Sequence, residues 1–197
     1  MPVTRMGTEH VQTVACLHAS GLAGVFLPSL GENFLRVFYR TALRHQLAFG
    51  FVWCEADRPV GFVLGSENSS RLFWSAIARS TFSLGWAAFP AVLRRPGLLL
   101  KVVETFLYPR RAAAVLDQAE LLVISIDAAR RGQGIGEALV QALNTAFREQ
   151  GVKSYKVTVL QSNKGANLFY QRLGFKSVGE FQLYQQGWNI YRFLLDG

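Results

Sequence analysis

Two arginines and three glycines occur together in the run Arg130-Arg131-Gly132-Gln133-Gly134-Ile135-Gly136. An apolar stretch precedes this run, and apolar residues at helical spacing follow it, so we expect it to open a helix. The first amides of a helix have no partner within the helix, and the helix dipole adds positive charge there. Glycines carry no Cβ to hold an anion away, and arginines add charge. The run therefore predicts a pyrophosphate site built from main-chain amides.

Two other phosphate-binding loops fit the run less well. A Walker A loop would need Gly-Lys-Ser/Thr after its glycines, and the dinucleotide fingerprint G-x-G-x-x-G would need glycine where Glu137 stands. A glycine-rich turn by itself also has a structural explanation, because glycines end strands and start helices in many folds.

A second motif, N-K-G-A-N-L-F-Y-Q-R-L-G-F, covers residues 163–175. Together with the R-x-x-G-x-G pattern of residues 131–136, it resembles the GNAT superfamily of acetyl-CoA-dependent N-acetyltransferases. The spacing between the two motifs suits one helix and one strand, and the resemblance covers residues 119–195. It implies a GNAT-like mixed, mostly antiparallel sheet flanked by helices, and acetyl-CoA as cosubstrate.

The resemblance also implies roles for individual residues. Main-chain amides from Gly132 to Glu137 would hold the pyrophosphate of coenzyme A, the strand end would pair with the pantetheine arm, and Asn163 would contact the cofactor while capping its own helix. Tyr170 would lie near the thioester sulfur and act as the catalytic acid. The implied cofactor-binding residues are Ile124, Ser125, Ile126, Arg131, Gly132, Gln133, Gly134, Ile135, Gly136, Glu137, Asn163 and Tyr170.

The chemistry of acetyl transfer requires a neutral amine, a donor for the developing oxyanion and a proton for the thiolate. A backbone N–H near Ile126 can serve as the donor, and a phenol with a pKa of about 10 is comparable in basicity to a thiolate. The general base stays open. Some relatives carry a glutamate on the strand before the asparagine helix, but residues 156–159 offer none. Glu120 and Asp127 are candidates that also have structural explanations, and a base acting through water or an already neutral amine are alternatives.

The histidines His10, His18 and His45 lack the spacing of metal ligands, so we expect structural or exposed histidines and no metal. The two cysteines exclude a disulfide framework. No run reaches the roughly 20 apolar residues of a membrane span, and the first residues do not resemble a signal peptide. We therefore expect a reduced, soluble, cytoplasmic protein.

The elements that must position these motifs can be read from periodicity and turn residues. We predict helices over residues 8–18, 31–44, 134–149 and 163–173. Strands are predicted over residues 3–6, 49–55, 60–65, 121–126, 153–160, 181–184 and 189–194. The turns are placed at residues 57–59 and at Gln186-Gly187. The resulting order predicts a mixed α/β sheet with helices packed on it. With 197 residues, half of them hydrophobic, the chain suits one domain over residues 1–197.

Residues 71–118 stand apart as a helical insertion between the third and fourth strands. Pro90, Pro96 and Pro109 predict several short helices rather than one long one. The segment contains seven basic and two acidic residues. Its net charge of +5 is more than half of the net charge of the chain, +8. Three interpretations stay open. The insertion covers the acceptor cleft, forms a homodimer interface through Trp74, Trp86 and Phe89, or makes peripheral contact with anionic lipid.

The leading functional hypothesis is an enzyme that transfers an acetyl group from acetyl-CoA to a primary amine of a small molecule, an amino sugar or a protein. The alternative is a non-catalytic acyl-CoA-binding or scaffold module. Nucleic-acid binding through Arg94, Arg95, Arg110 and Arg111 is the least favoured hypothesis.

Overall fold

The protein is built on a seven-stranded sheet with the strand order β1-β2-β3-β4-β5-β7-β6. The computed structural model describes residues 3–22, 25–44, 46, 48–98, 100–101, 104 and 117–195. The strands are β1 (Val3–Arg5), β2 (Phe49–Glu55), β3 (Arg58–Ser66), β4 (Glu120–Ile126), β5 (Ser154–Leu160), β6 (Lys176–Leu183) and β7 (Gln186–Leu194). Only β4 and β5 pair in parallel; the other neighbours are antiparallel. This confirms the predicted mixed, mostly antiparallel sheet.

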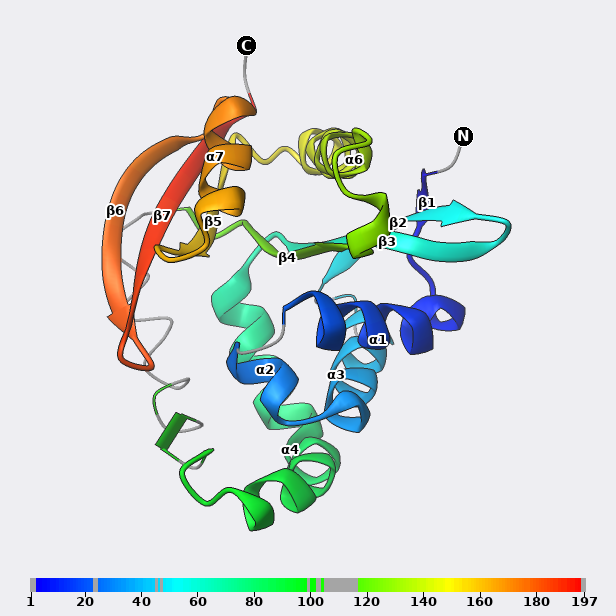
Figure 1. Cartoon of the computed structure of the whole chain (residues 1–197), viewed down its shortest axis with the longest axis vertical. Coiled ribbons are helices and arrows are strands. Elements are labelled where there is room, and N and C mark those ends of the chain that lie inside the picture. Colours follow the sequence, from blue (N-terminus) through cyan, green and yellow to red (C-terminus); the bar gives the residue numbers. More distant parts are fainter. Residues whose placement is uncertain are drawn as a thin grey trace.

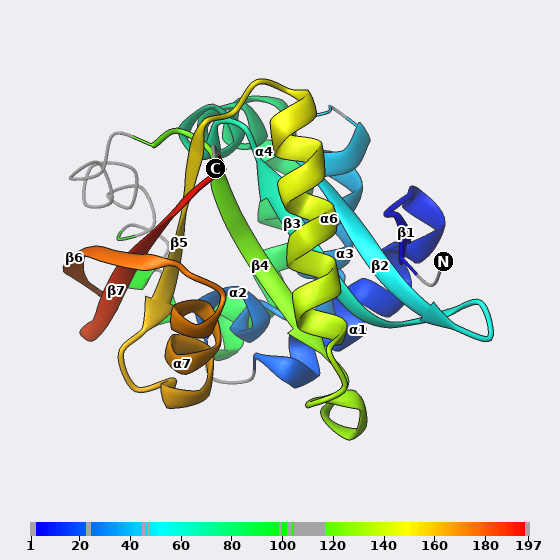
Figure 2. The ribbon, with the colours of Figure 1, turned by 90° about the horizontal axis from the view of Figure 1, so that it is seen from above.

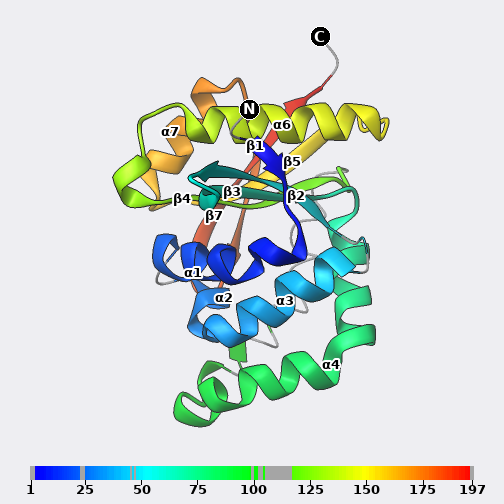
Figure 3. The ribbon, with the colours of Figure 1, turned by 90° about the vertical axis from the view of Figure 1, so that its right-hand side faces the viewer.

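Helices cover both faces of the sheet (Figure 1, Figure 3). One face carries α6 (Ile135–Glu149) and α7 (Lys164–Arg172). The other carries the 3-10 turn η1 (Thr8–His10) and the helices α1 (Val11–Gly21), α2 (Phe26–Ser29) and α3 (Glu32–Arg44). An apolar core lies in each layer. The core under α6 contains its apolar residues Ile135, Leu139, Val140, Leu143 and Phe147, all buried.

Two hairpin turns lie one or two residues before their predicted positions. The β2–β3 turn is made by Ala56 and Asp57, and the β6–β7 turn by Tyr184 and Gln185, all four with positive φ. Two-residue turns of this kind match the twist of the strands they join. The prediction of a turn at Gln186-Gly187 was therefore wrong, because these residues already pair with β6 as the first residues of β7.

Helix α4 (Ser69–Arg94) is one continuous helix, so the prediction of several short helices was wrong over this stretch. Pro90 lies inside it, and the helix continues because Ala88, Ala91 and Val92 pack against a small apolar cluster that holds this turn in place. The helix ends at Arg94, and its C-cap Arg95 directly precedes Pro96, as a proline predicts. Pro109, Arg110 and Arg111 lie outside the described residues, as does His45. No described helix has the length and apolarity that crossing a membrane requires.

Candidate active site

Strands β4 and β5 run side by side only at their beginnings and then diverge. Their register contains two pairs, Glu120↔Lys156 and Leu121↔Val157, whereas β4 stays paired with β3 as far as Ile126. A bulge leaves Leu122 without a register partner on β3, and a bulge bends the strand that carries it. Figure 2 shows the two strands separating toward their C-terminal ends, where α7 and the first turn of α6 lie. The middle of the sheet therefore opens into a gap at this end.

The edge of β4 along this gap presents main-chain groups. The amide of Asp127 donates to the carbonyl of Val60 at 2.8 Å, so Asp127 directs its polar groups toward β3. Because these directions alternate along a strand, Ile124 and Ile126 direct theirs to the opposite side, into the gap. The carbonyl of Ile126 accepts a hydrogen bond from Nε of Arg131 at 3.3 Å. Two of the three strand-end residues singled out in the sequence thus offer main-chain groups at the open edge.

Ser125, the third of these residues, is tied to the opposite layer. Its side chain is buried, and its hydroxyl donates to the carbonyl of Leu17 on α1 at 3.1 Å. Since its neighbours face the gap, the main-chain groups of Ser125 face β3. Ser125 therefore anchors the end of α1 to β4.

The turn between β4 and α6 is exposed over residues 131–134. Gly132 and Gly134 have φ values of 78° and 79°, a conformation that side-chain-bearing residues rarely adopt, and Gly134 is the N-cap of α6. Space around both glycines is open, because a Cβ at either position would meet nothing within 4 Å. The first amides of α6 therefore follow an uncovered turn. The anion site expected at these residues stays a prediction.

The remaining residues of the loop have separate environments. Arg130 forms an ion pair with Glu55, 2.8 Å between Nε and Oε2, and Ile135 is buried in the core under α6. Gln133 and Glu137 are exposed. A carboxylate in the first turn of a helix interacts favourably with the helix dipole, but it repels a bound anion. The side chain of Glu137 is therefore not a phosphate ligand.

Asn163 and Tyr170 lie on opposite ends of α7. Oδ1 of Asn163 accepts a hydrogen bond from the amide of Ala166 at 3.1 Å, which confirms its predicted capping role. Tyr170 is buried, and its ring contacts those of Phe169, Phe175 and Tyr191. Burial raises the pKa of the Tyr170 phenol above its usual value of 10.0. Among the described residues, none forms a hydrogen bond with its hydroxyl.

Known proteins resemble this chain in the C-terminal region that carries both motifs. A family model described as an acetyltransferase (GNAT) domain matches residues 102–177. The chain is also 38% identical over 64 residues to the [ribosomal protein bS18]-alanine N-acetyltransferase of Escherichia coli K12. The C-terminal part of the chain is therefore similar to GNAT acetyltransferases. The 64 matched residues span 32% of this chain and 43% of that relative.

Solved structures show that the likeness of fold extends beyond the matched segment. An N-acetyltransferase from Staphylococcus aureus Mu50 superimposes with a TM-score of 0.63 at 15% identity, covering 98% of each chain. The ribosomal-protein-S18-alanine N-acetyltransferase from Escherichia coli gives a TM-score of 0.62 at 15% identity, covering 99% of this chain and 94% of that one. The GNAT fold therefore includes the N-terminal helices of this chain.

A polar network that the motifs did not reveal fixes α7 to the sheet. Nδ2 of Asn167 donates to the carbonyl of Leu160 at 2.9 Å, and its Oδ1 accepts from Nδ2 of Asn189 at 2.8 Å and from the hydroxyl of Tyr191 at 2.9 Å. Gln171 extends the network to the same hydroxyl. The available signal was the asparagine itself, which has a low helix propensity and is unusual inside a helix unless its side chain is bonded.

Neither candidate base is placed for proton abstraction at the gap. Glu120 begins β4 and is buried opposite Lys156, at the closed end of the strand pair. Ile126 is six positions further along the strand, so the two residues lie about 20 Å apart at the usual rise per residue. Asp127 lies at the open end, but its Oδ1 accepts the amide of Ala129 at 2.9 Å and caps the following turn. Asp127 therefore has a capping role, and Glu120 lies too far from the gap to act there.

His18 is structural, in agreement with the sequence. It is buried between α1 and the sheet, with Nδ1 2.7 Å from the hydroxyl of Tyr39. Burial lowers its pKa from 6.5 to about 4, so the ring is neutral near pH 7. Within the described part of the chain, no three His, Cys, Asp or Glu residues are grouped closely enough to hold a metal ion.

The insertion reaches the far side of the gap. The ring of Phe26 on α2 contacts that of Tyr184 at the β6–β7 turn, with centroids 5.1 Å apart. The amide of Tyr184 donates to Oε2 of Glu104 at 2.8 Å, and Leu98 packs beside Phe26. Residues of the insertion therefore hold α2 and the β6–β7 turn together.

Proposed function

We propose that this protein transfers an acetyl group from acetyl-CoA to a primary amine. The observation that carries the proposal is the convergence of three features at one end of the sheet. These are the unpaired main-chain edge of β4, the exposed glycine turn before α6, and helix α7, which carries Tyr170 and meets the first turn of α6 at Gly136. An acyl-CoA is a ligand with matching parts, since its diphosphate needs main-chain amides and its pantetheine amides can pair with a strand edge.

The residues of the chain divide the binding of acetyl-CoA between them. Main-chain amides of residues 132–137 take the pyrophosphate, and Arg131 supplies a cation once it releases the carbonyl of Ile126. The edge of Ile124 and Ile126 pairs with the pantetheine arm. Nδ2 of Asn163 can contact the cofactor because only Oδ1 is used for capping. Ser125 and Ile135 contribute through position, since their side chains pack inside the protein.

Acetyl-CoA supplies an acyl group activated as a thioester. The amide of Ile126 faces the gap and can donate to the thioester oxygen as negative charge develops there; one such donor contributes about 2.7–4 kcal/mol. Tyr170 holds the proton that the departing sulfur needs. Its raised pKa keeps the phenol protonated until the sulfur beside it becomes a strong base. We assign no side chain as the base, so the amine enters neutral or loses its proton through water.

The acceptor is a primary amine of a small molecule, an amino sugar or a protein. The Escherichia coli relative is named for N-acetylation of an alanine in ribosomal protein bS18, which places a peptide amine among the candidates. The contacts that join Phe26, Tyr184 and Glu104 support an acceptor cleft walled by the insertion. Both cysteines are free, which supports a reducing, cytoplasmic setting.

Two measurements test the proposal. Mass spectrometry after incubation with acetyl-CoA and a panel of amines, including a peptide that begins with alanine, is expected to show a product 42 Da heavier (about one acetyl group). Calorimetry with coenzyme A is expected to show binding that Gly134→Ala weakens, because alanine is strained at φ 79°. Gly97→Ala is the matched control, since that glycine also stands in open space but has no positive φ. Binding without turnover would favour the acyl-CoA-binding module, and no binding would refute both.

A further inference from the structure

Residues 86–93 of helix α4 are apolar on two sides, and among the described side chains only one of these sides is packed. Ala88, Ala91 and Val92 lie against the cluster formed by Phe26, Leu30 and Leu98. At 100° per residue, Trp86, Phe89 and Leu93 fall on the opposite arc of the helix. These three side chains are 72%, 55% and 71% exposed. Isolated exposed apolar residues are common, but two large aromatics and a leucine on one helical arc form a patch.

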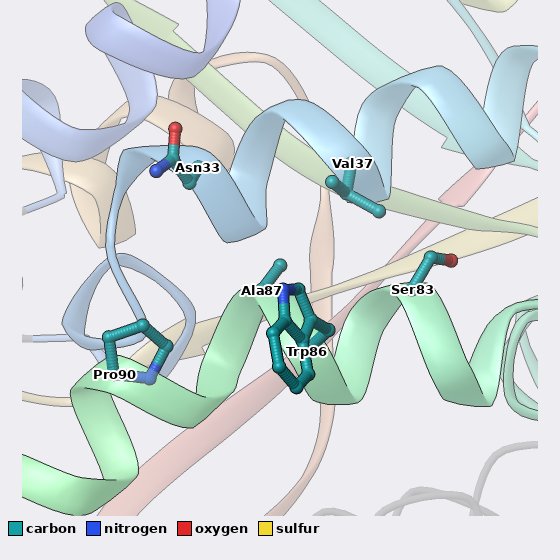
Figure 4. Close-up of a pocket in the computed structure, with 6 residues that line it drawn as sticks. All are labelled: Asn33, Val37, Ser83, Trp86, Ala87 and Pro90. Carbon is teal, nitrogen blue, oxygen red and sulfur yellow. The ribbon is translucent and has the colours of Figure 1, made fainter.

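The patch is preorganised rather than scattered. The rings of Trp86 and Phe89 are stacked nearly parallel, with centroids 6.1 Å apart and an interplanar angle of 8°. Beside them lies a hollow of about 500 Å³ between α3 and α4, lined by Asn33, Val37, Ser83, Trp86, Ala87 and Pro90 (Figure 4). Figure 3 shows α4 as the outermost layer, separated from α6 and α7 by the sheet and by α3. Helix α4, which carries the patch, therefore lies on the side of the molecule opposite to α6 and α7 (Figure 3).

The charge around the patch has one sign. Between Glu67 and Glu104 the sequence contains five basic residues and no acidic one. Arg94 and Arg95 follow Leu93 directly and are exposed. Helices α3 and α4 together contain six arginines, and Glu32 is their only acidic residue. An exposed aromatic patch bordered by arginines is the pattern of helices that lie at a bilayer surface.

We propose that the outer face of α4 docks on an anionic lipid surface, with Trp86, Phe89 and Leu93 entering the interface and Arg94 and Arg95 pairing with lipid phosphates. A second copy of the chain fits this face less well. In a contact between two copies of this face, the segment between Glu67 and Glu104 has no carboxylate to pair with Arg94 and Arg95. The indole of Trp86 favours the headgroup region, and Phe and Leu are typical of the apolar face of interfacial helices.

Vesicle flotation with the full chain tests the proposal. Phosphatidylcholine vesicles with about one third phosphatidylglycerol are expected to carry the protein at low salt, and pure phosphatidylcholine vesicles to carry far less. Arg94→Gln with Arg95→Gln should weaken anionic binding roughly 30-fold, given about 1 kcal/mol per basic residue near such a surface. Trp86→Ser with Phe89→Ser should lose the binding that persists at high salt. Arg5→Gln with Arg58→Gln is the matched control, because it removes the same charge from exposed residues at the other end of the sheet.

Each contrary result has a definite meaning. Failure of the protein to float with anionic vesicles at low salt would overturn the proposal. Equal losses of vesicle binding in the Arg94/Arg95 and Arg5/Arg58 variants would also overturn it, because net charge alone would then explain the binding. A concentration-dependent dimer that the Trp86/Phe89 variant dissolves would assign the patch to a second copy. Salt-sensitive binding to single-stranded DNA that outcompetes the vesicles would assign it to nucleic acid. Acetyl transfer is measured separately and is not required for any of these outcomes.

Discussion

Gly136 and Phe169 stand so close that a Cβ at position 136 would lie 3.1 Å from Cζ of the Phe169 ring. The same Cβ would lie 3.1 Å from Cδ1 of Ile126. The first turn of α6, the end of β4 and the middle of α7 therefore meet at one point. Gly136 differs in this from Gly132 and Gly134, which are needed for their backbone conformation and border open space. The third glycine of the motif sets the distance between the turn and the helix that carries Tyr170.

Gly136→Ala should therefore disturb both stability and cofactor binding. The added methyl must displace the Phe169 ring or Ile126, and such overpacking typically costs about 1–3 kcal/mol. We expect a lower free energy of unfolding in urea and a higher KM for acetyl-CoA. Gly85→Ala is the control, since a Cβ there meets nothing within 4 Å and alanine stabilises a helix interior by about 0.5–1 kcal/mol. Equal stability of the two variants would contradict this account.

Tyr170→Phe should lower kcat about 100-fold or more while leaving the Kd for coenzyme A nearly unchanged. The substitution keeps the ring among Phe175 and Tyr191 and removes only the hydroxyl. Because burial raises the pKa of this phenol, the rate of the parent protein should not fall through phenol ionisation as the pH approaches 10. Single-turnover rates across pH provide the measurement.

Tyr191→Phe is the matched control for Tyr170→Phe. It removes a hydroxyl that donates to Asn167, so it should cost stability, about 1 kcal/mol, with little loss of kcat. If both variants lost kcat equally, the role assigned to the Tyr170 hydroxyl would be wrong.

The sequence predicted the parts of this fold in which local pattern and tertiary packing agree. The bounds predicted for the helix over 134–149 and the strand over 121–126 agree with the structure to within one residue. Apolar spacing alone specifies the face of each element that the core then buries. At the second hairpin, Gly187 was taken as the turn residue, but pairing with β6 holds it in a strand and leaves positive φ to Tyr184 and Gln185. Pro90 predicted a break that packing around Ala88 and Ala91 overrides.

The sequence could predict only those parts of the candidate site whose main-chain conformation follows from a local motif. The turn at residues 131–136 and the cap at Asn163 follow from local sequence. The bulge at Leu122, which bends β4 and opens the gap, depends on pairing with β3 and has no local signature. The network around Asn167 joins residues that are more than twenty positions apart, and such contacts cannot be read from one sequence.

Asn167→Ala should destabilise the protein by about 2 kcal/mol. It leaves the carbonyl of Leu160, the amide group of Asn189 and the hydroxyl of Tyr191 without their partner in a partly buried place. Asn163→Ala, which removes only an exposed cap, should cost about 1 kcal/mol. Urea denaturation of both variants measures the difference. A smaller loss at Asn167 than at Asn163 would show that the network does not stabilise α7.

His18 should make the stability of the protein depend on pH between about 6.5 and 4. Burial lowers its pKa to about 4 in the folded chain, whereas the unfolded chain binds a proton at the ordinary value of 6.5. As the pH falls through this window, the unfolded state takes up the proton first, so stability is lost, by about 2 kcal/mol between pH 7 and pH 5. His18→Gln should flatten the dependence by that amount. Tyr39→Phe removes the hydrogen-bond partner but keeps the ring buried, so it should lower stability at every pH and retain the slope. If Tyr39→Phe abolished the slope instead, the hydrogen bond rather than burial would control the protonation of His18.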